Sequence, residues 1–235
     1  MIIAIETSTT FGSVAVVEEG NLIAEECMFV PQGHCENVLP MLDAMLSRAG
    51  IKISSASAFA VSLGPGSFTA LRIGLSTAKA LSFSSGKPLV GVGTLDAIAY
   101  NVAGLCPYVC PIIDAKRGEV FYSLYRDQAG RQERLVQYGA DRPEKAALEI
   151  FPFLASVSEG SVAFLGDGVE LCRESIEARI EGRSLFPPYH IGIPRASSVG
   201  MLALGLLRQG KVDDVERLEP IYVRRSDAEL RKERS

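Results

Sequence analysis

Short apolar runs and longer periodic stretches divide the first half of the chain into strands and helices. Apolar runs at residues 2–6, 13–17 and 22–30 predict three successive strands, and Glu19-Gly20-Asn21 supplies a hairpin turn between the last two. Apolar residues then recur every three or four positions in three stretches, which predict helices, and two short apolar runs between them predict strands. The predicted helices span residues 36–49, 68–83 and 94–103, and these strands span residues 58–63 and 88–92. The element order is therefore βββαβαβα.

The second half follows the same order. Three strands are predicted at residues 108–114, 119–125 and 134–138, followed by a helix at 143–155 and a strand at 161–165 that runs into Gly166-Asp167-Gly168 and a further helix. In both halves an acidic residue ends the first strand and a glycine follows soon after: Glu6 and Gly12, then Asp114 and Gly118. Prolines break up the end of this half, where no fifth strand is predicted. A last helix at residues 197–208 can return to the first domain.

The duplicated order predicts an α/β protein of two tandem domains. Three antiparallel strands followed by βα units give mixed sheets, and two such βββαβα domains in tandem are typical of the actin-like (ASKHA, ribonuclease H-like) architecture, here with the second domain reduced. We place the domains at residues 1–104 and 105–235, with the last helix and the tail as candidates to return to the first domain. Because this fold hosts many functions, it does not by itself assign one.

Composition and charge narrow the classes of function. The chain has 235 residues, 47% of them hydrophobic, and a mean hydropathy of +0.18, which is typical of a protein folded along most of its length. A net charge of −4 offers no general attraction to nucleic acid, so we expect contact with RNA to be local or made through a partner. The first residues lack the basic start of a signal peptide, and we find no apolar run long enough to span a bilayer, so we expect a cytoplasmic protein. The five cysteines are scattered, which favours reduced thiols in the core.

Residues 64–74, with the sequence GPGSFTALRIG, predict a strand–turn–helix corner. Gly64 and Gly66 can take the positive φ of a tight turn, and Ser67 suits the N-cap of the helix that follows. Such a corner can point free backbone N–H groups at an anion. The run lacks the Gly-Lys-Ser/Thr of a P-loop and the flanking glycine of a nucleophile elbow. By itself, therefore, the local pattern favours a capped helix packed on a sheet.

The polar turn after the first strand leaves a catalytic interpretation open. Glu6, Thr9 and Gly12 in the first half, and Asp114 in the second, are candidate ligands for phosphate and Mg²⁺ in a stand-alone actin-like small-molecule phosphotransferase. Gly166-Asp167-Gly168 adds a weak nucleotide signal, which a helix cap explains as well.

A metalloprotein of unknown reaction is a third, weaker interpretation. The two histidines, His34 and His190, lie far apart, and neither has a second histidine four residues away to share a metal on one helix. Cys106 and Cys110 lack a second pair of cysteines or histidines, so they do not make a zinc motif. We therefore expect no metal ligands in this chain.

Five motifs follow one another in the order that a known family shows. They are Ile5-Glu6-Thr7-Ser8, HCENVLP at residues 34–40, GPGSFTALRIG at 64–74, GVGTLDA at 91–97 and DAKRGEV at 114–120. Together they resemble the motifs of the TsaB (YeaZ) family, although Ala70 stands where that family usually has glycine. The resemblance covers most of the first half of the chain and extends into the second.

The resemblance implies a non-catalytic paralogue of TsaD, the enzyme that transfers a threonylcarbamoyl group to N6 of the adenosine beside the tRNA anticodon. TsaD uses a metal held by a His-x-x-x-His helix, and Thr94 and Ile98 stand at the matching positions here. The implied role is a scaffold subunit that pairs with TsaD and the ATPase TsaE, forms a homodimer when alone and meets tRNA only through the complex, with no membrane involved. No cofactor is then bound by this chain alone, and ATP and a metal are expected elsewhere in the complex.

Two helices are the expected partner surface. Gly74 inside the helix at residues 68–83 costs about 1 kcal/mol relative to alanine, and small residues around it allow either another protein's helix or an element of its own domain to approach closely. In the helix at residues 36–49, methionines make the apolar face adaptable, and Pro40 favours a start near Val38. The expected interface residues are Val38, Leu39, Met41, Leu42, Met45, Leu46, Ala70, Leu71, Gly74, Leu75, Ala78 and Ser82.

Overall fold

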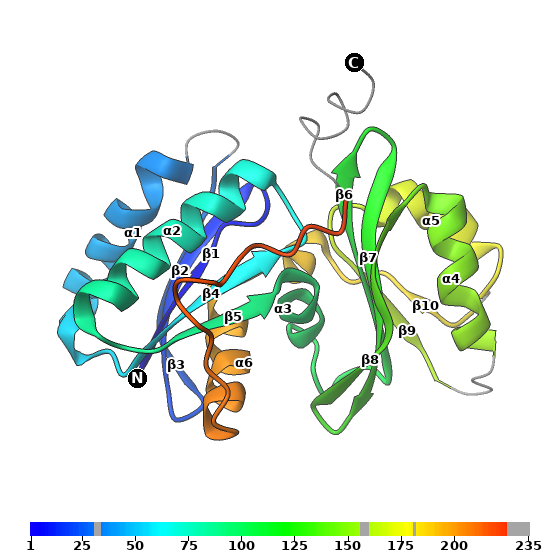
Figure 1. Cartoon of the computed structure of the whole chain (residues 1–235). Coiled ribbons are helices and arrows are strands. Elements are labelled where there is room, and N and C mark those ends of the chain that lie inside the picture. The colour runs from blue at the N-terminus through cyan, green and yellow to red at the C-terminus, as the bar shows by residue number, and fades with distance from the viewer. Residues whose placement is uncertain (31–33, 156–159, 181, 225–235) are drawn as a thin grey trace, which may run out of the picture. The chain divides into compact units, whose positions relative to one another are not determined.

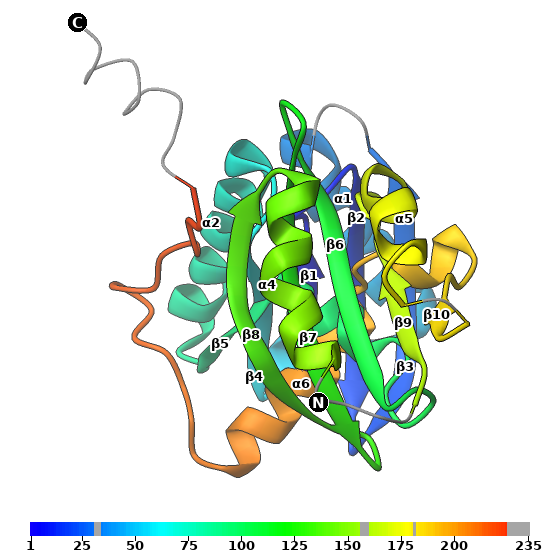
Figure 2. The same ribbon diagram turned by 90° about the vertical axis from the view of Figure 1, so that its right-hand side faces the viewer.

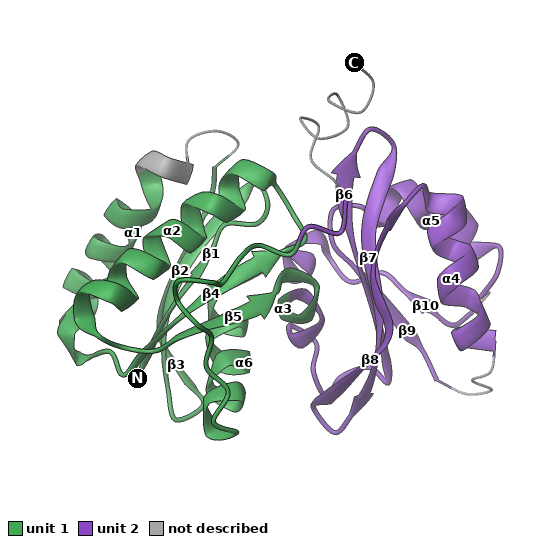
Figure 3. Ribbon diagram, viewed as in Figure 1, with its two compact units in different colours: residues 1–97, 194–221 green, residues 98–193, 222–235 purple. Residues whose placement is uncertain are grey.

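Two five-stranded mixed sheets form the framework of the chain, each in a compact unit of its own (Figure 3). The structure, a computed structural model, describes residues 1–30, 34–155, 160–180 and 182–224, and the side chains of residues 34–36 lie outside that description. Unit 1 comprises Met1–Ala97 and Pro194–Ile221, and unit 2 comprises Ile98–Ile193 and the residues from Tyr222 on. The sequence pattern placed the division at residues 104 and 105, seven residues later than the first boundary between the compact units, which falls inside one helix.

The sheet of unit 1 has the strand order β3-β2-β1-β4-β5. Its central strand, β1, pairs antiparallel with β2 and parallel with β4. The β-branched and small apolar residues of these strands are buried on both faces, as expected of a sheet covered by helices on two sides. The strands are β1 (Ile2–Glu6), β2 (Phe11–Glu18), β3 (Asn21–Phe29), β4 (Ala58–Gly64) and β5 (Leu89–Gly93).

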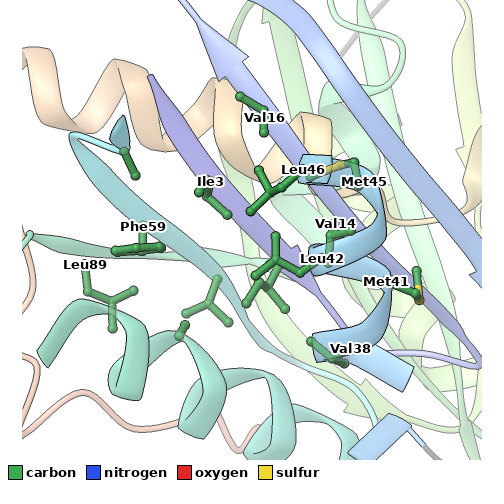
Figure 4. Packing of buried hydrophobic residues seen from close by; sticks show 14 of the residues in the cluster. Ile3, Val14, Val16, Val38, Met41, Leu42, Met45, Leu46, Phe59 and Leu89 are labelled. Atoms are coloured by element: carbon green, nitrogen blue, oxygen red, sulfur yellow. The ribbon is translucent and has the colours of Figure 1, made fainter. Parts of the chain in front are cut away.

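Helices cover both faces of this sheet (Figure 1). On one face lie α1 (His34–Ala49) and α2 (Phe68–Ser85), which pack against each other, and on the other lies α6 (Ala196–Arg208). Figure 4 shows Val38, Leu42 and Met45 of α1 beside side chains of β1 and β2, in the larger core of unit 1. A short 3-10 helix, Ile53–Ser55, precedes β4, and α3 (Thr94–Tyr100) follows β5.

Unit 2 repeats the plan, because its strand order, β10-β9-β6-β7-β8, corresponds strand for strand to that of unit 1. Helices α4 (Pro143–Ala155) and α5 (Val169–Glu177) cover one face of this sheet (Figure 2). A 3-10 helix spans Tyr189–Gly192. The strands are β6 (Tyr108–Lys116), β7 (Glu119–Gln128), β8 (Arg131–Asp141), β9 (Val162–Leu165) and β10 (Ser184–Leu185). The predicted fold class, two tandem actin-like domains with the second reduced, is confirmed.

Three details differ from the sequence expectations. Helix α1 begins at His34 and contains Pro40, because buried Val38, Met41 and Leu42 on both sides of the proline hold the helix on the sheet. Strand β10, which the pattern missed, has only two residues. Cys106, Cys110 and Cys172 are buried thiols as expected, whereas Cys27 is exposed on the edge strand β3.

One segment, Tyr189–Arg208, is long and apolar enough to pass for a membrane span, so our expectation that no run reaches that length is wrong. The structure divides this segment into a 3-10 helix and α6, which has 13 residues and is about 20 Å long, shorter than a bilayer core of about 30 Å. Ala196, Val199 and Ala203 of α6 are buried against the sheet of unit 1. A core helix passes the same test of length and composition.

Candidate functional site

The corner between β4 and α2 is in contact with two other parts of the chain. These are the turn after β1, at Ser8, and the C-terminal segment of unit 1, at Ile221. Gly64 has a φ of +107°, as its position in the turn predicts, and a Cβ on it would lie 2.9 Å from Leu71 Cδ1 and 3.0 Å from the carbonyl oxygen of Ile221. The N–H of Ile221 donates to the carbonyl oxygen of Leu63 at 2.7 Å. Gly64 is therefore needed where the C-terminal segment of unit 1 meets the corner.

The second glycine of the corner makes room for the turn after β1. A Cβ on Gly66 would lie 2.3 Å from the carbonyl oxygen of Ser8, so no side chain fits there. That oxygen accepts the N–H of Ser67 at 2.7 Å. Ser67 is the N-cap residue of α2, as predicted, but its hydroxyl makes no capping hydrogen bond. A backbone donor that was a candidate for an anion is thus used inside the chain, as the packing interpretation requires.

Gly74 in the interior of α2 has the same kind of role. A Cβ on Gly74 would lie 2.3 Å from Oγ1 of Thr7, and that hydroxyl donates to the carbonyl oxygen of Ala70 at 2.8 Å. The missing side chain lets α2 lie directly on the turn between β1 and β2. Of the two interpretations that the sequence left open for Gly74, the structure supports close packing within its own domain.

Glu6 ends β1 as a fully buried carboxyl group, 0% exposed. Its Oε1 accepts the backbone N–H of Ser8, while its Oε2 has no hydrogen-bond partner among the described protein atoms. Burial raises the pKa of Glu6, and hydrogen bonds from Ser8 and Ser62 lower it by less. This is the direction expected of a buried carboxylate without a cation beside it. Glu6 is not accessible to a ligand in solution.

The other two candidates of this turn are also used by the fold. Oγ1 of Thr9 accepts the N–H of Phe11 at 3.2 Å, which closes the turn, and Gly12 is buried within β2. Thr94 and Ile98, the two positions that the family resemblance singled out for the absence of a histidine pair, are both 0% exposed in α3. Across the described residues, no cluster of three or more His, Cys, Asp or Glu side chains is placed to hold a metal ion.

Asp114 lies in unit 2, where it contacts Lys116 of the same motif and Asp167 of the turn after β9. Its carboxylate accepts the backbone N–H of Lys116 at 2.7 Å and the Lys116 ammonium at 2.8 Å. The N–H of Asp114 donates to Oδ1 of Asp167 at 2.9 Å. The sequence showed Asp167 only as the centre of a glycine turn. Its nearness to Asp114 follows from β6 and β9 being parallel neighbours, since their carboxyl ends meet at one edge of the sheet.

The glycines that flank Asp167 are required by packing. A Cβ on Gly166 would lie 2.1 Å from the carbonyl oxygen of Ile112, and one on Gly168 would lie 2.7 Å from the carbonyl carbon of Ile113. Both clashes are with the backbone of β6, so the turn lies directly on that strand. Gly168 is also the N-cap residue of α5. The structural interpretation of Gly166-Asp167-Gly168 therefore suffices.

Most of the expected interface residues lie inside unit 1. An apolar stripe identifies the face of a helix that is buried, and here the sheet of the same unit buries it. Only Leu39 is exposed, at 53%. The buried ones are Val38, Met41, Leu42, Met45, Leu46, Ala70, Leu71, Gly74, Leu75, Ala78 and Ser82. The two helices remain a candidate partner surface, but with their outward faces rather than with this stripe.

The outward face of α2 was not singled out from the sequence, yet its composition is unusual for a face in water. Ser76, Ala80 and Ser84 are exposed there, and Phe83 is 80% exposed. From residue 73 to residue 85 the only charged side chain of α2 is Lys79, whose ammonium donates to the carbonyl oxygen of Glu216 at 3.2 Å. A solvated helix face normally carries several charges. The low number of charged residues between positions 73 and 85 was the feature of the sequence that could have identified this face.

Comparison with known proteins identifies the family. A family model described as "TsaD: tRNA N6-adenosine threonylcarbamoyltransferase" matches residues 28–232. The chain is 30% identical over 235 residues to the tRNA threonylcarbamoyladenosine biosynthesis protein TsaB of Escherichia coli, covering 97% of this chain and 96% of that protein. The chain belongs to the TsaB family. The TsaB protein of Bacillus subtilis is 28% identical over 230 residues, covering 98% of this chain and 96% of that protein.

A solved structure of the same family has the same fold. YeaZ from Pseudomonas aeruginosa is 26% identical to this chain and superposes with a TM-score of 0.78, covering 94% of this chain and 98% of that one. The similarity thus includes both units, not only the motifs of the first half. The resemblance to TsaB (YeaZ) that the motifs indicated is confirmed, and the family model relates the TsaB fold to TsaD.

Proposed function

We propose that this chain is a non-catalytic scaffold subunit in the biosynthesis of threonylcarbamoyladenosine in tRNA. It binds the TsaD paralogue through the outward faces of α1 and α2, acts together with the ATPase TsaE in the cytoplasm, and uses the same faces to form a homodimer when alone. The transfer of the threonylcarbamoyl group to N6 of the adenosine beside the anticodon takes place on TsaD. ATP and the metal are bound elsewhere in the complex, and tRNA meets this chain only indirectly.

The state of the candidate catalytic groups supports the non-catalytic role. Glu6 is 0% exposed, so its carboxyl group does not face a substrate or a metal ion in solution. The turn hydroxyls of Thr7 and Thr9 are engaged with Ala70 and Phe11. A stand-alone phosphotransferase would need these groups to face a substrate, and no observation here favours that alternative.

The main observation behind the partner surface is the outward face of α2, where small and apolar side chains are exposed and the charged residues are Arg72 in the first turns and Lys79. Ser76, Ala80 and Ser84 have small side chains, which allow another helix to approach closely, and Phe83 offers a large apolar group of the kind that anchors protein interfaces. On α1, Leu39 adds a second exposed apolar side chain. The acidic net charge of the chain, −4, is consistent with tRNA being bound by the partners.

Substitution of one exposed alanine on this face tests the proposal. Ala80→Arg places a long, charged side chain on the outward face of α2, where it is expected to prevent close helix packing and reduce co-purification with the TsaD paralogue at least about tenfold. The matched control is Ala155→Arg, because Ala155 is also exposed and helical but lies on α4 of unit 2. Both variants are co-expressed with TsaD, and the amount of TsaD retained is compared with the wild type.

The two outcomes are distinct. Loss of TsaD with Ala80→Arg but not with Ala155→Arg supports the proposed surface. Undiminished binding of TsaD by the Ala80→Arg protein would exclude the outward face of α2. A separate titration of the isolated protein with Mg-ATP tests the alternative. Heat of binding in that titration would support the phosphotransferase interpretation.

A further inference from the structure

Unit 2 contains a cavity that the proposed function does not use. It has a volume of about 250 Å³ and lies where the turn after β9 and the start of α5 meet the segment between β10 and the second 3-10 helix. Gly192 and Gly166 both line it and lie in contact, since a Cβ on Gly192 would lie 2.4 Å from the Gly166 nitrogen. Its side walls include Phe164, Phe186, Pro187 and Tyr189.

The walls of the cavity are flat and mostly apolar. Phe164 and Phe186 stack with their ring centres 5.8 Å apart and 27° between the ring planes. The guanidinium of Arg173 lies over the Phe186 ring, 4.1 Å from its centre, and Tyr189 is 57% exposed. A ligand with a thin, planar group fits walls of this kind better than a compact, strongly hydrated one does.

Asp167 is the polar group of this cavity whose charge is not balanced by an ion pair. One of its oxygens, Oδ1, accepts the N–H of Asp114. Among the described residues no salt bridge to Asp167 is formed, although Lys116 lies near enough to lower its pKa. The net effect is a raised pKa, because the desolvation of the carboxyl group, together with repulsion from Asp114, outweighs its backbone hydrogen bonds and the attraction of Lys116. An added positive charge at Asp167 would therefore be stabilised.

The cations around the cavity are already committed to other carboxylates. The Lys116 ammonium binds Asp114 at 2.8 Å, and Arg173 binds Glu170 at 2.9 Å and Glu177 at 3.4 Å. With Asp167, these groups comprise four carboxylates and two cations. The local charge is therefore negative, which favours a cationic ligand over an anion such as phosphate.

We propose that this cavity binds a guanidinium group, with Asp167 as its counter-ion. The planar guanidinium donates hydrogen bonds to the carboxylate of Asp167, and its flat faces lie against Tyr189 and Pro187. The group can belong to a free guanidino compound or to an arginine side chain of another protein. This inference does not depend on the partner surface of α2.

Titration of the whole ¹⁵N-labelled chain with small probes tests it, with the amide signals of Gly166 and Gly192 as the readout. The probes are methylguanidine and acetyl-arginine amide, and their matched neutral controls are methylurea and acetyl-citrulline amide. Saturable shifts below about 10 mM are expected for the guanidinium probes, and binding at least about tenfold weaker for the urea analogues. Equal affinity for arginine and citrulline amides, or no saturable shift with either guanidinium probe, would overturn the proposal.

Variants of two aspartates add a second, independent readout. Asp167→Asn keeps an oxygen to accept the Asp114 N–H but removes the charge, so arginine amide should bind at least about tenfold more weakly. Asp127→Asn is the control, because Asp127 likewise accepts backbone N–H groups, from Gly104 and Gly130, but does not line the cavity. Unchanged binding by a folded Asp167→Asn protein would also overturn the proposal. If that variant does not fold, the comparison of arginine with citrulline on the wild type decides.

The same titrations distinguish the two sources of the group. Equal affinity for methylguanidine and arginine amide supports a site that contacts only the guanidinium group. The ligand would then be a free guanidino compound. Tighter binding of a short arginine-containing peptide than of either probe supports an arginine side chain of a protein. Both results support the guanidinium site.

Discussion

A Cβ on Gly66 would lie 2.3 Å from the carbonyl oxygen of Ser8, so the corner after β4 and the turn after β1 are in direct backbone contact. Gly74, in the interior of α2, makes a second close approach to the same turn, in this case to the side chain of Thr7. The glycines of the most distinctive motif in the chain therefore serve close packing at this corner. In a catalytic protein of this architecture the same turns would be expected to face a substrate.

The contact between Gly74 and Thr7 predicts an unusual response to alanine. Gly74→Ala is expected to lower the free energy of unfolding by about 1–3 kcal/mol, because the new methyl group would clash with Oγ1 of Thr7. Helix propensity alone would predict the opposite sign. Unfolding in urea, followed by circular dichroism, measures the difference.

A second helical glycine provides the control. A Cβ on Gly205, within α6, meets no atom within 4 Å, so Gly205→Ala is expected to raise the free energy of unfolding by about 0.5–1 kcal/mol. If both substitutions stabilise the protein equally, the packing role of Gly74 is wrong.

Glu6 predicts how stability changes with pH. Its folded-state pKa is raised above the ordinary value of 4.5, so the unfolded chain ionises first as the pH rises. The contribution of Glu6 to stability is therefore fully present below pH 4.5 and is lost as the pH rises toward the folded-state pKa. Glu6→Gln cannot ionise, so its stability relative to the wild type should increase over that interval. Urea unfolding of both proteins at several pH values checks this, and parallel pH profiles would show that Glu6 has no shifted pKa.

The fold was largely predictable because its strands and helices carry strong patterns. Apolar runs such as residues 2–5 of β1 and the periodic stripe around Val38 define elements whose burial the structure confirms. Strand β10 was not predicted, because two residues are too few to show the alternation of apolar and polar side chains that identifies a strand. The start of α1 was misplaced because tertiary packing on both sides of Pro40 outweighs the hydrogen bond that the proline cannot donate.

The candidate site was less predictable, because sequence patterns show that a residue is buried without showing what buries it. The stripe that includes Leu71 and Ala78 fits a partner interface and a domain core equally well, and the structure assigns it to the core of unit 1. In the same way, a glycine such as Gly66 can indicate a positive φ, an anion site or a close backbone contact. Only the position of Ser8 in space decides between them.

Two neighbouring alanines of α2 should therefore respond differently to arginine. Ala78 is 0% exposed, so Ala78→Arg buries an unpaired charge and is expected to cost more than about 4 kcal/mol or to prevent folding. Ala80 is exposed, and Ala80→Arg should change the free energy of unfolding by no more than about 0.5 kcal/mol. Thermal unfolding of the two purified proteins separates them. Equal stability of the two variants would contradict the orientation of α2.

The C-terminal segment of unit 1 gives a further prediction, because Asp213 covers the free edge of β5. Its Oδ2 accepts the N–H of Gly91 at 2.7 Å, and its own N–H donates to the carbonyl oxygen of Leu89 at 3.0 Å. Asp213→Ala is expected to cost about 1–3 kcal/mol, since the Gly91 N–H loses its acceptor. Asp213→Asn keeps an acceptor oxygen and should cost less. Urea unfolding measures both, and a larger loss with asparagine than with alanine would rule out this hydrogen bond as the cause.

The threonylcarbamoyladenosine content of tRNA tests the scaffold role most directly. Cells that lack the native copy of this protein are complemented with the wild type, Glu6→Gln or Ala80→Arg, and the modified nucleoside is quantified by mass spectrometry. We predict that the wild type and Glu6→Gln restore the modification, because Glu6 performs no chemistry, whereas Ala80→Arg does not, because it cannot bind TsaD. Restoration by Ala80→Arg together with failure of a stably folded Glu6→Gln would contradict the account and assign a chemical role to the turn after β1.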